Sequence, residues 1–300
     1  MKRYLWILLA VMALVAGCHK APLPPDPEDP DNPEVPVIPE PPYTVEESSF
    51  STQRDGLRIG GVLFSPVELK GRKPAVILCH GLDGSWLDTE PYGRAAARLG
   101  CVSFCFDFCG GHDGESKSEG ERKDHSVLTE IQDVAAVYNA MKAREDVDPD
   151  RIFLMGGSQG GLVAALYAAD HPSYIKAMGL MFPAFNLPEL VRTYTNLFYQ
   201  DNLENVPASV DLLGHTFYKK YITDAYGLYP FDKIGAYEGP VLIMHGDKDS
   251  LVPIDNSRTA LQKYKNATLV VFEGQGHGFD DEGTAKAIDY LEEFLSQHWN

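Results

Sequence analysis

The sequence predicts an α/β fold: a mainly parallel, twisted sheet flanked by helices, with a small inserted cap. Apolar segments typical of buried strands alternate with helical segments along most of the chain. Such alternation is typical of a parallel sheet covered on both faces. One connection between two predicted strands is longer than a helix and a short loop require. Residues 43–300 provide enough chain for one large core.

The first 17 residues are predicted to be a signal peptide of the lipoprotein type. Lys2 and Arg3 form a short positive region, and the apolar run Leu5–Val15 is too short to span a membrane as a helix. Small residues then precede Cys18, a pattern that resembles the lipobox of bacterial lipoproteins. We therefore expect Cys18 to be lipidated and to anchor the protein in the cell envelope, at the outer membrane or the cell surface. The alternative is an ordinary secretion signal that is cleaved nearby.

Residues 18–42 are predicted to form a Pro-rich acidic tether. Ten prolines, interleaved with Asp and Glu, lie between Ala21 and Pro42. Such a segment has too few apolar groups to pack a core. An extended Pro-rich chain rises about 3.1 Å per residue and would hold a domain roughly 70 Å from the membrane. Two interpretations stay open: a spacer that lets the domain reach bulky or insoluble material, or a leader without a specific role.

The charge balance excludes some partners. The formal net charge is −17, and removal of the leader with Lys2 and Arg3 makes the chain more acidic still. Such acidity argues against binding of nucleic acid and against flat association with anionic lipid.

Within residues 43–300, short apolar segments predict strands and longer periodic segments predict helices. The predicted strands are Leu57–Phe64, Ala75–Cys79, Val102–Phe106, Ile152–Met155, Ala177–Phe182, Val241–Met244 and Leu269–Phe272. The predicted helices include Val127–Ala143, Asn256–Tyr264 and Thr284–Gln297. Connections between parallel strands should be right-handed.

The long connection runs from Pro183 to Gly239 and predicts an inserted cap over a pocket, at about Asn186–Ala236. Its aromatic residues are Tyr194, Phe198, Tyr199, Phe217, Tyr218, Tyr221, Tyr226, Tyr229 and Phe231. Aromatic walls with hydroxyl tips suit a flat, apolar acyl group that bears a phenol. The other interpretation is that these rings only hold the cap against the body.

The most informative segment is the G-x-S-x-G pattern from Gly156 to Gly160, between an apolar strand and the helical segment Leu162–Ala169. A sharp strand-to-helix turn exposes the serine hydroxyl, and the chain crosses itself so closely that only small residues fit on either side. Free N–H groups at the start of the helix point to where negative charge would develop. We therefore expect Ser158 to be a nucleophile.

A serine nucleophile of this kind needs an acid and then a histidine further along the chain. His277 lies in a glycine-flanked loop after the last predicted strand, and we expect it to accept the Ser158 proton. Asp249 follows the preceding strand and is the expected acid that orients the imidazole. Asp247 and Glu273 are alternatives, although Asp247 follows its strand so closely that bracing of the turn is the favoured role.

Acyl transfer also needs hydrogen-bond donors for an oxyanion. One expected donor is the Gln159 N–H, directly after the nucleophile, and the other is the Leu82 N–H, in the loop after strand Ala75–Cys79. The alternative for that loop is a simple strand-ending turn. His80 and His245 lie beside glycines at strand ends and are expected to be buried and hydrogen-bonded.

These motifs resemble an α/β-hydrolase, and within that superfamily they are similar to bacterial feruloyl (cinnamoyl) esterases and their serine-hydrolase relatives. The matching segments are His80-Gly81-Leu82-Asp83-Gly84, Gly157-Ser158-Gln159-Gly160-Gly161, His245-Gly246-Asp247-Lys248-Asp249, Val252-Pro253 and Gly276-His277. The resemblance covers the chain from about residue 45 onward. It implies Ser158 as nucleophile, Asp249 as acid and His277 as base, with the Leu82 and Gln159 N–H groups as oxyanion donors.

The resemblance does not specify the substrate. The family often has Asp, two residues and then Gly-x-Gly-x-Ser after the fourth strand, whereas the segment Asp107–Ser116 is longer here. That loop borders the pocket in relatives, so the alcohol part of the substrate is left open. The relatives also carry a small inserted cap.

Four cysteines remain besides Cys18. Three of them lie on or beside predicted core strands, where a free cysteine packs as a small apolar residue. Secretion permits disulfides, and Cys79 and Cys105 would be strand neighbours, so a disulfide is left open. The spacing of Cys101, Cys105 and Cys109 does not indicate a metal site.

The leading hypothesis is a lipid-tethered serine esterase that needs no cofactor and no metal. Its expected substrates are hydroxycinnamoyl (feruloyl) or acetyl esters from plant polysaccharide. The enzyme would bind them as small-molecule or oligosaccharide esters. A second hypothesis is a peptidase of the prolyl-oligopeptidase kind, although those enzymes usually carry an N-terminal propeller for which this chain has no room. General carboxylesterases and lipases also stay open. A hypothesis from another class is a non-catalytic surface binding protein on a hydrolase scaffold.

Overall fold

The computed structural model describes residues 43–112, 114–212 and 214–299. The predicted signal peptide, Cys18 and the Pro-rich tether lie outside the described residues. None of the helices in the described part of the chain is long and apolar enough to cross a bilayer.

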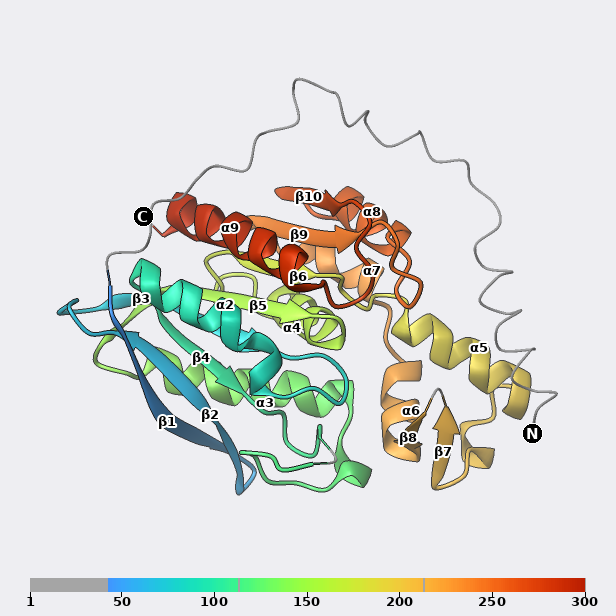
Figure 1. The fold of residues 1–300 in the computed structure, drawn as a ribbon. Helices are drawn as coiled ribbons and strands as arrows, with labels where there is room; N and C mark the ends of the chain where they lie inside the picture. The colour runs from blue at the N-terminus through green and yellow to red at the C-terminus, as the bar shows by residue number, and fades with distance from the viewer. Residues whose placement is uncertain (1–42, 113, 213, 300) are drawn as a thin grey trace. The chain divides into compact units, whose positions relative to one another are not determined.

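An eight-stranded sheet forms the centre of the fold, in the order β1-β2-β4-β3-β5-β6-β9-β10 (Figure 1). Its strands are β1 Val45–Arg54, β2 Leu57–Pro66, β3 Lys73–Cys79, β4 Val102–Phe106, β5 Val147–Gly157, β6 Met178–Met181, β9 Val241–Gly246 and β10 Ala267–Phe272. Strands β1 and β2 are antiparallel to each other, and β2 is antiparallel to β4. All other neighbouring pairs of this sheet are parallel. The predicted mainly parallel sheet is therefore confirmed.

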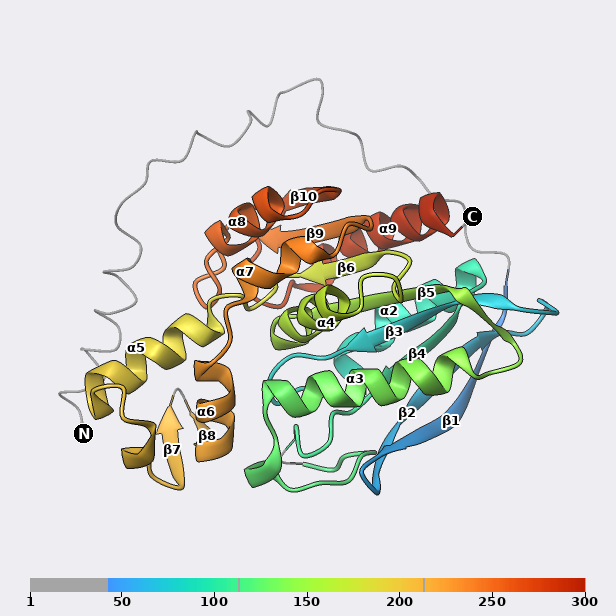
Figure 2. The same ribbon diagram turned by 180° about the vertical axis from the view of Figure 1, so that it is seen from behind.

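Helices cover both faces of the sheet. They are α2 Trp86–Leu99, α3 Val127–Lys142, α4 Gln159–Asp170, α8 Asp255–Lys263 and α9 Asp281–His298. Helices α2 and α9 pack on the face that Figure 1 shows in front, and α3, α4 and α8 pack on the face seen from behind in Figure 2. A central strand is therefore buried on both sides, which explains why β3, β4 and β9 are buried along their whole length and mostly apolar.

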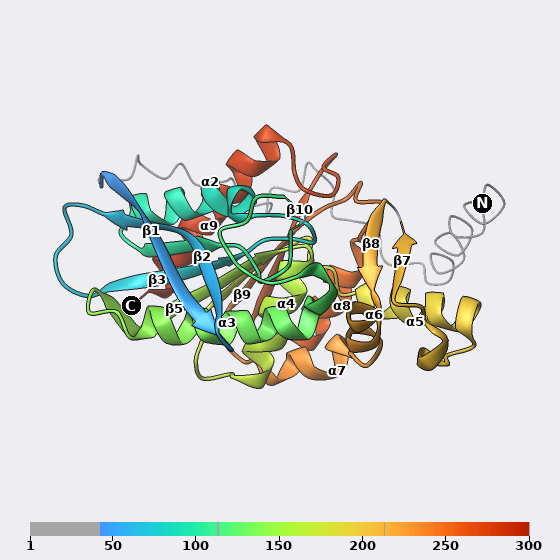
Figure 3. The ribbon, with the colours of Figure 1, turned by 90° about the horizontal axis from the view of Figure 1, so that it is seen from below.

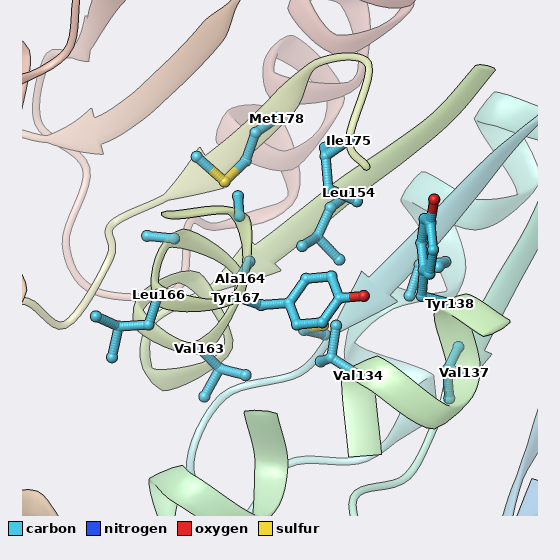
Figure 4. Close-up of a cluster of buried hydrophobic side chains, with 14 of the residues drawn as sticks. Val134, Val137, Tyr138, Leu154, Val163, Ala164, Leu166, Tyr167, Ile175 and Met178 are labelled. Carbon is cyan, nitrogen blue, oxygen red and sulfur yellow. The ribbon is translucent and has the colours of Figure 1, made fainter. Parts of the chain in front are cut away.

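The core between the sheet and α3 and α4 is tightly filled by large side chains (Figure 4). Tyr167 of α4 lies beside Val134 and Tyr138 of α3, and the two tyrosine ring centroids are 6.1 Å apart. Leu154 of β5 and Met178 of β6 close this cluster from the sheet side. Because α4 begins directly at Gln159, this packing fixes the direction in which the helix leaves the Ser158 turn.

The segment between β6 and β9, for which a cap was predicted, forms small elements of its own. They are α5 Leu187–Tyr199, η2 Leu203–Asn205, β7 Ser209–Leu212, β8 His215–Tyr218, α6 Lys219–Tyr226, α7 Pro230–Lys233 and η3 Ile234–Ala236. Strands β7 and β8 pair as an antiparallel hairpin outside the main sheet. The group of α5, α6 and the hairpin lies beyond the carboxyl ends of the parallel strands (Figures 1 and 3).

All seven predicted strands and the three predicted helices are present, with shifted ends. Strand β1 and helix α2 were not predicted. Most of the side chains in β1 are exposed or half-buried, so the strand lacks an apolar run. Helix α2 contains Pro91, which obscures its helical pattern, but it begins with a capping box in which Ser85 and Asp88 bond each other's backbone N–H groups.

Candidate active site

Ser158 occupies a sharp turn between β5 and α4, with φ 52° and ψ −120°. This region is unfavourable for a residue with a side chain, and such strain is typical of functional sites. The two flanking glycines permit the turn because a Cβ atom on Gly156 would lie 2.2 Å from the Gly160 carbonyl oxygen. A Cβ atom on Gly160 would lie 2.3 Å from the carbonyl oxygens of Cys79 and His80. The turn therefore requires glycine at both positions.

Three side chains from distant parts of the chain form a continuous hydrogen-bonded row. The Oγ atom of Ser158 lies 2.9 Å from Nε2 of His277, and Nδ1 of His277 lies 2.8 Å from Oδ2 of Asp249. Ser158 follows β5, Asp249 follows β9 and His277 follows β10, so all three lie at the carboxyl edge of the sheet. The structure thus brings together the three residues that the sequence indicated.

Asp249 is held by four hydrogen-bond donors. Its Oδ1 atom accepts the N–H groups of Leu251 at 3.0 Å and Val252 at 2.8 Å, and Oδ2 contacts His277 and, at 3.2 Å, Nε2 of His245. Burial raises the pKa of the Asp249 carboxyl, but the hydrogen bonds from His245, His277 and Val252 outweigh burial and hold it well below its usual range. Asp249 therefore stays ionised beside the imidazole.

The two alternative acids lie elsewhere. Oδ1 of Asp247 accepts the Gly274 N–H at 2.7 Å, and Oδ2 pairs with Lys248 at 2.8 Å. The bond to Lys248, reinforced by the one to Gly274, lowers the Asp247 pKa. Asp247 thus braces the turn, and Glu273 is exposed.

His245 is buried and hydrogen-bonded, as expected, but its contact with Asp249 was missed. Its Nε2 atom lies 2.9 Å from the Val252 carbonyl oxygen, so this nitrogen must carry the proton. Nδ1 then accepts the Ser257 hydroxyl at 2.7 Å. The spacing of four residues between His245 and Asp249, directly after a buried strand, is the sequence signal that could have indicated this pair.

The loop after β3 lies against Ser158. A Cβ atom on Gly81 would be 3.2 Å from the Ser158 Cβ and 3.7 Å from its Oγ. Buried His80 fixes this loop, because its Nε2 accepts the Phe108 N–H at 3.1 Å and Nδ1 therefore donates to the Gly81 carbonyl at 2.7 Å. Within the described residues, the N–H groups of Leu82 and Gln159 donate no backbone hydrogen bond. Neither N–H group is therefore engaged by another backbone carbonyl of the described residues.

The cap aromatics divide into two groups. Phe217 and Phe231 pack against the core, and the Phe217 ring centroid lies 5.0 Å from that of Tyr221, which favours the holding role for these rings. Tyr194 and Phe198 of α5 contact each other at 4.9 Å, and Phe198 remains exposed. Phe198 therefore lies on the surface, whereas Tyr194 is half-buried.

The four cysteines of the described residues are free and buried. The disulfide left open between Cys79 and Cys105 does not form, although β3 and β4 are neighbours. Cys105 is in register with Leu78, and Cys79 and Cys105 belong to the cores on opposite faces of the sheet. Their side chains therefore point away from each other. In the part of the chain that is described, no cluster of His, Cys, Asp and Glu could hold a metal ion.

The sheet order and the strained serine turn define a hydrolase of the α/β-hydrolase fold. The chain belongs to the prolyl oligopeptidase family, whose sequence profile matches residues 92–300. Among solved structures, it is similar to Est1E from Butyrivibrio proteoclasticus with bound ferulic acid. That structure is 28% identical with a TM-score of 0.75, and the match covers 83% of this chain and 98% of the other.

Two curated relatives carry different names. The uncharacterized peptidase YtmA of Bacillus subtilis (strain 168) is 27% identical over 217 residues, which are 70% of this chain and 76% of the relative. A monoacylglycerol lipase of Mycolicibacterium smegmatis is 26% identical over 240 residues, which are 71% of this chain and 84% of the relative. One relative is thus named a peptidase and the other a lipase.

Proposed function

We propose that this protein is a serine carboxylesterase that works through a Ser-His-Asp triad and an acyl-enzyme intermediate. The observation that carries the proposal is the row from Ser158 through His277 to Asp249, with distances of 2.9 and 2.8 Å. A hydroxyl is a weak nucleophile until a base takes its proton, and an imidazole within hydrogen-bond reach is suited to this task.

In the proposed reaction, Oγ of Ser158 attacks the ester carbonyl while Nε2 of His277 takes the hydroxyl proton. The negative charge on the carbonyl oxygen is stabilised by the N–H groups of Leu82 and Gln159. The ionised Asp249 carboxylate accepts the hydrogen bond from the Nδ1–H group of His277 and stabilises the imidazolium that forms. His277 then gives its proton to the leaving alcohol, and water releases the acid by the same steps.

The proposed acyl groups are hydroxycinnamoyl (feruloyl) or acetyl groups on plant polysaccharide or its fragments. The bound ferulic acid in Est1E, the relative with a TM-score of 0.75, supports this substrate class. The cluster of Tyr194, Phe198 and Tyr199 on α5, in which Phe198 is exposed, supports it as well, because aromatic surfaces suit a flat, apolar acyl group. The reaction as proposed uses protein side chains, backbone amides and water.

A second candidate function is hydrolysis of peptide bonds. The family to which the chain belongs, and its similarity to an uncharacterized peptidase, favour it. Hydrolysis of glycerol esters is a third candidate, favoured by the similarity to a monoacylglycerol lipase. All three reactions would use the same Ser158 elbow, so the distinction lies in the acyl and leaving groups that the enzyme accepts.

The proposed location is the bacterial cell envelope, through a lipid on Cys18. Lipid chains contribute about 0.8 kcal/mol for each buried CH₂ group, so several chains give stable anchoring. In a bacterial host, the full-length protein should partition into the detergent phase of Triton X-114, and Cys18→Ala should move it to the aqueous phase. Detergent partitioning that persists in Cys18→Ala would remove the anchor assignment.

The test of the function is a substrate panel for the wild-type enzyme and Ser158→Ala. Acetyl, butyryl, long-chain and feruloyl esters are compared with a chromogenic prolyl amide. The proposal predicts turnover of acetyl or feruloyl esters above the others and a loss of about 10⁴-fold or more in Ser158→Ala. Amide turnover without ester turnover would favour the peptidase, and preference for long chains the lipase. Binding of a ferulate without any turnover would indicate a non-catalytic binding protein.

A further inference from the structure

The side chain of Gln159 takes part in a buried network that reaches the cap. Its Nε2 atom donates to both carboxylate oxygens of Glu130 on α3, each at 2.8 Å. Its Oε1 atom accepts the hydroxyl of Tyr221 on α6. His125 completes the network, with Nε2 at 2.7 Å from Oε1 of Glu130. All four side chains are at most 3% exposed.

The chemistry of the partners fixes the orientation of the Gln159 amide. The NH₂ group donates to both oxygens of Glu130, so the carbonyl of the same amide faces the Tyr221 hydroxyl and accepts from it. Burial raises the pKa of the Tyr221 phenol well above its usual range, so its hydroxyl keeps the proton that it donates. Every polar atom of the Gln159 side chain is therefore satisfied, and such buried networks hold a side chain in one position.

The cap contacts the other proposed oxyanion segment as well. Asp83, directly after Leu82, has φ 57°, forms an ion pair with Arg122 and is hydrogen-bonded to Nδ1 of His215 on β8. A further contact attaches α6 to the body, where the Ser126 hydroxyl, at the start of α3, donates to Asp224 at 2.6 Å. Figure 2 shows α6 beside this end of α3. The cap thus contacts residues at both proposed oxyanion donors.

We propose that Tyr221 and Glu130 are positioning residues that clamp Gln159 from both sides, so that a seated cap holds the Gln159 N–H in place for the oxyanion. This inference rests on the proposed function, because it assigns the Gln159 N–H to oxyanion binding. It adds that the cap supports the chemical step itself, beyond any contact with the acyl group. A donor displaced by about 1 Å costs up to about 100-fold in rate.

The role of Tyr221 differs from that of a pocket wall. Its side chain is 3% exposed, and its hydroxyl contacts Gln159. A wall residue would change KM in a manner that depends on the acyl group. A positioning residue changes the energy of the oxyanion and thus lowers kcat for every ester by a similar factor.

The experiment compares Tyr221→Phe with Tyr237→Phe in the full-length protein. Tyr237 is a matched control because its side chain is also buried and its hydroxyl also donates one hydrogen bond, to the Ile175 carbonyl at 3.2 Å. This bond lies near the amino ends of β6 and β9, and Tyr237→Phe removes it. Both variants are assayed with 4-nitrophenyl acetate and methyl ferulate. We expect Tyr221→Phe to lower kcat about 10- to 100-fold for both esters with KM within about twofold, and Tyr237→Phe to keep wild-type kcat.

A second variant and a second readout guard against a folding effect. Glu130→Gln keeps the shape of the side chain but replaces one acceptor with a donor, and we expect a similar loss in kcat. A trifluoromethyl ketone, whose carbonyl becomes an oxyanion when Ser158 adds to it, should bind both Gln159-network variants about 10- to 100-fold more weakly than the wild type.

Three outcomes would overturn the inference. Wild-type kcat in a folded Tyr221→Phe or Glu130→Gln variant refutes positioning and leaves the esterase proposal intact. A loss in kcat of the same size in Tyr237→Phe assigns the effect to general destabilisation. A wild-type enzyme that turns over no ester and does not react with the ketone refutes the proposed function together with this inference.

Discussion

The Nε2 atom of His245 lies 3.2 Å from Oδ2 of Asp249, the same oxygen that Nδ1 of His277 contacts at 2.8 Å. One carboxylate oxygen thus serves two imidazoles, while the other oxygen is held by two backbone N–H groups. Because Asp249 lies in a loop, these four donors are what fixes its direction toward His277. His245, at the end of β9, connects this loop to the rigid sheet.

Replacement of His245 tests that connection. His245→Asn removes the Nε2 donor to Asp249 and to the Val252 carbonyl, because the shorter side chain has no atom at that position. We expect a loss of about 1–3 kcal/mol in the free energy of unfolding, because buried polar groups lose their partners. We also expect kcat to fall about 10-fold as the acid loses its orientation. Urea unfolding and steady-state kinetics measure the two effects. An active, fully stable variant would show that the backbone N–H groups suffice to hold Asp249.

The ionised state of Asp249 predicts a pH dependence of stability. Its folded-state pKa is held below the unfolded value of about 3.9, so the carboxylate contributes stability that is complete above that value and is lost as the pH falls toward the folded-state pKa. Asp249→Asn lacks this contribution at every pH. The difference in unfolding free energy between wild type and variant should be full at pH 5 and should narrow toward pH 3. A difference that widens on acidification would mean that the folded-state pKa is raised.

The same variant also tests the proposed orientation of the imidazole. An amide at position 249 can turn either its NH₂ group or its oxygen toward His277. It therefore no longer fixes the tautomer of His277 in which Nε2 is free to accept the Ser158 proton. We expect kcat to fall about 10⁴-fold at neutral pH. Kinetics of Asp247→Asn serve as the matched control, because Asp247 contacts Gly274 and Lys248 instead. Equal losses in the two variants would contradict the choice of Asp249.

The chain crosses itself closely beneath Ser158, so we expect the stability of the fold to depend strongly on glycine at position 160. In Gly160→Ala the new methyl group would meet the carbonyl oxygens of Cys79 and His80 at 2.3 Å. We expect a loss of at least about 3 kcal/mol in unfolding free energy, because the backbone of β3 cannot yield. In the control Gly276→Ala, nothing lies within 4 Å of the new Cβ. The two thermal unfolding midpoints should differ clearly, and similar values would disprove the tight crossing.

Local patterns in the sequence were sufficient for the parts of the site that follow apolar strands. Ser158, Asp249 and His277 each come after such a strand and beside turn residues, and parallel strands bring their carboxyl ends to one edge. The contact of Tyr221 with Gln159 could not be predicted in this way, because 62 residues separate them and the contact depends on how the cap docks. The same holds for the pair of His215 and Asp83, which are 132 residues apart.

Besides helix α2, three strands of the fold, β1, β7 and β8, were missed for local reasons. The side chains of strand β1 are mostly polar, and it pairs only with β2 at the sheet edge, so its strand character comes from the partner. Strands β7 and β8 are four residues each, too short for a periodic pattern to be recognised.

The most direct test of the central claim is the site at which a fluorophosphonate reacts. The serine oxygen would displace fluoride from phosphorus, and the proton would pass to His277. We expect one phosphonyl group per wild-type chain by intact mass, mapped to Ser158 by peptide analysis, no adduct in Ser158→Ala and slow labelling in His277→Asn. A wild-type protein that stays unlabelled, or an adduct that persists in Ser158→Ala, would contradict the account.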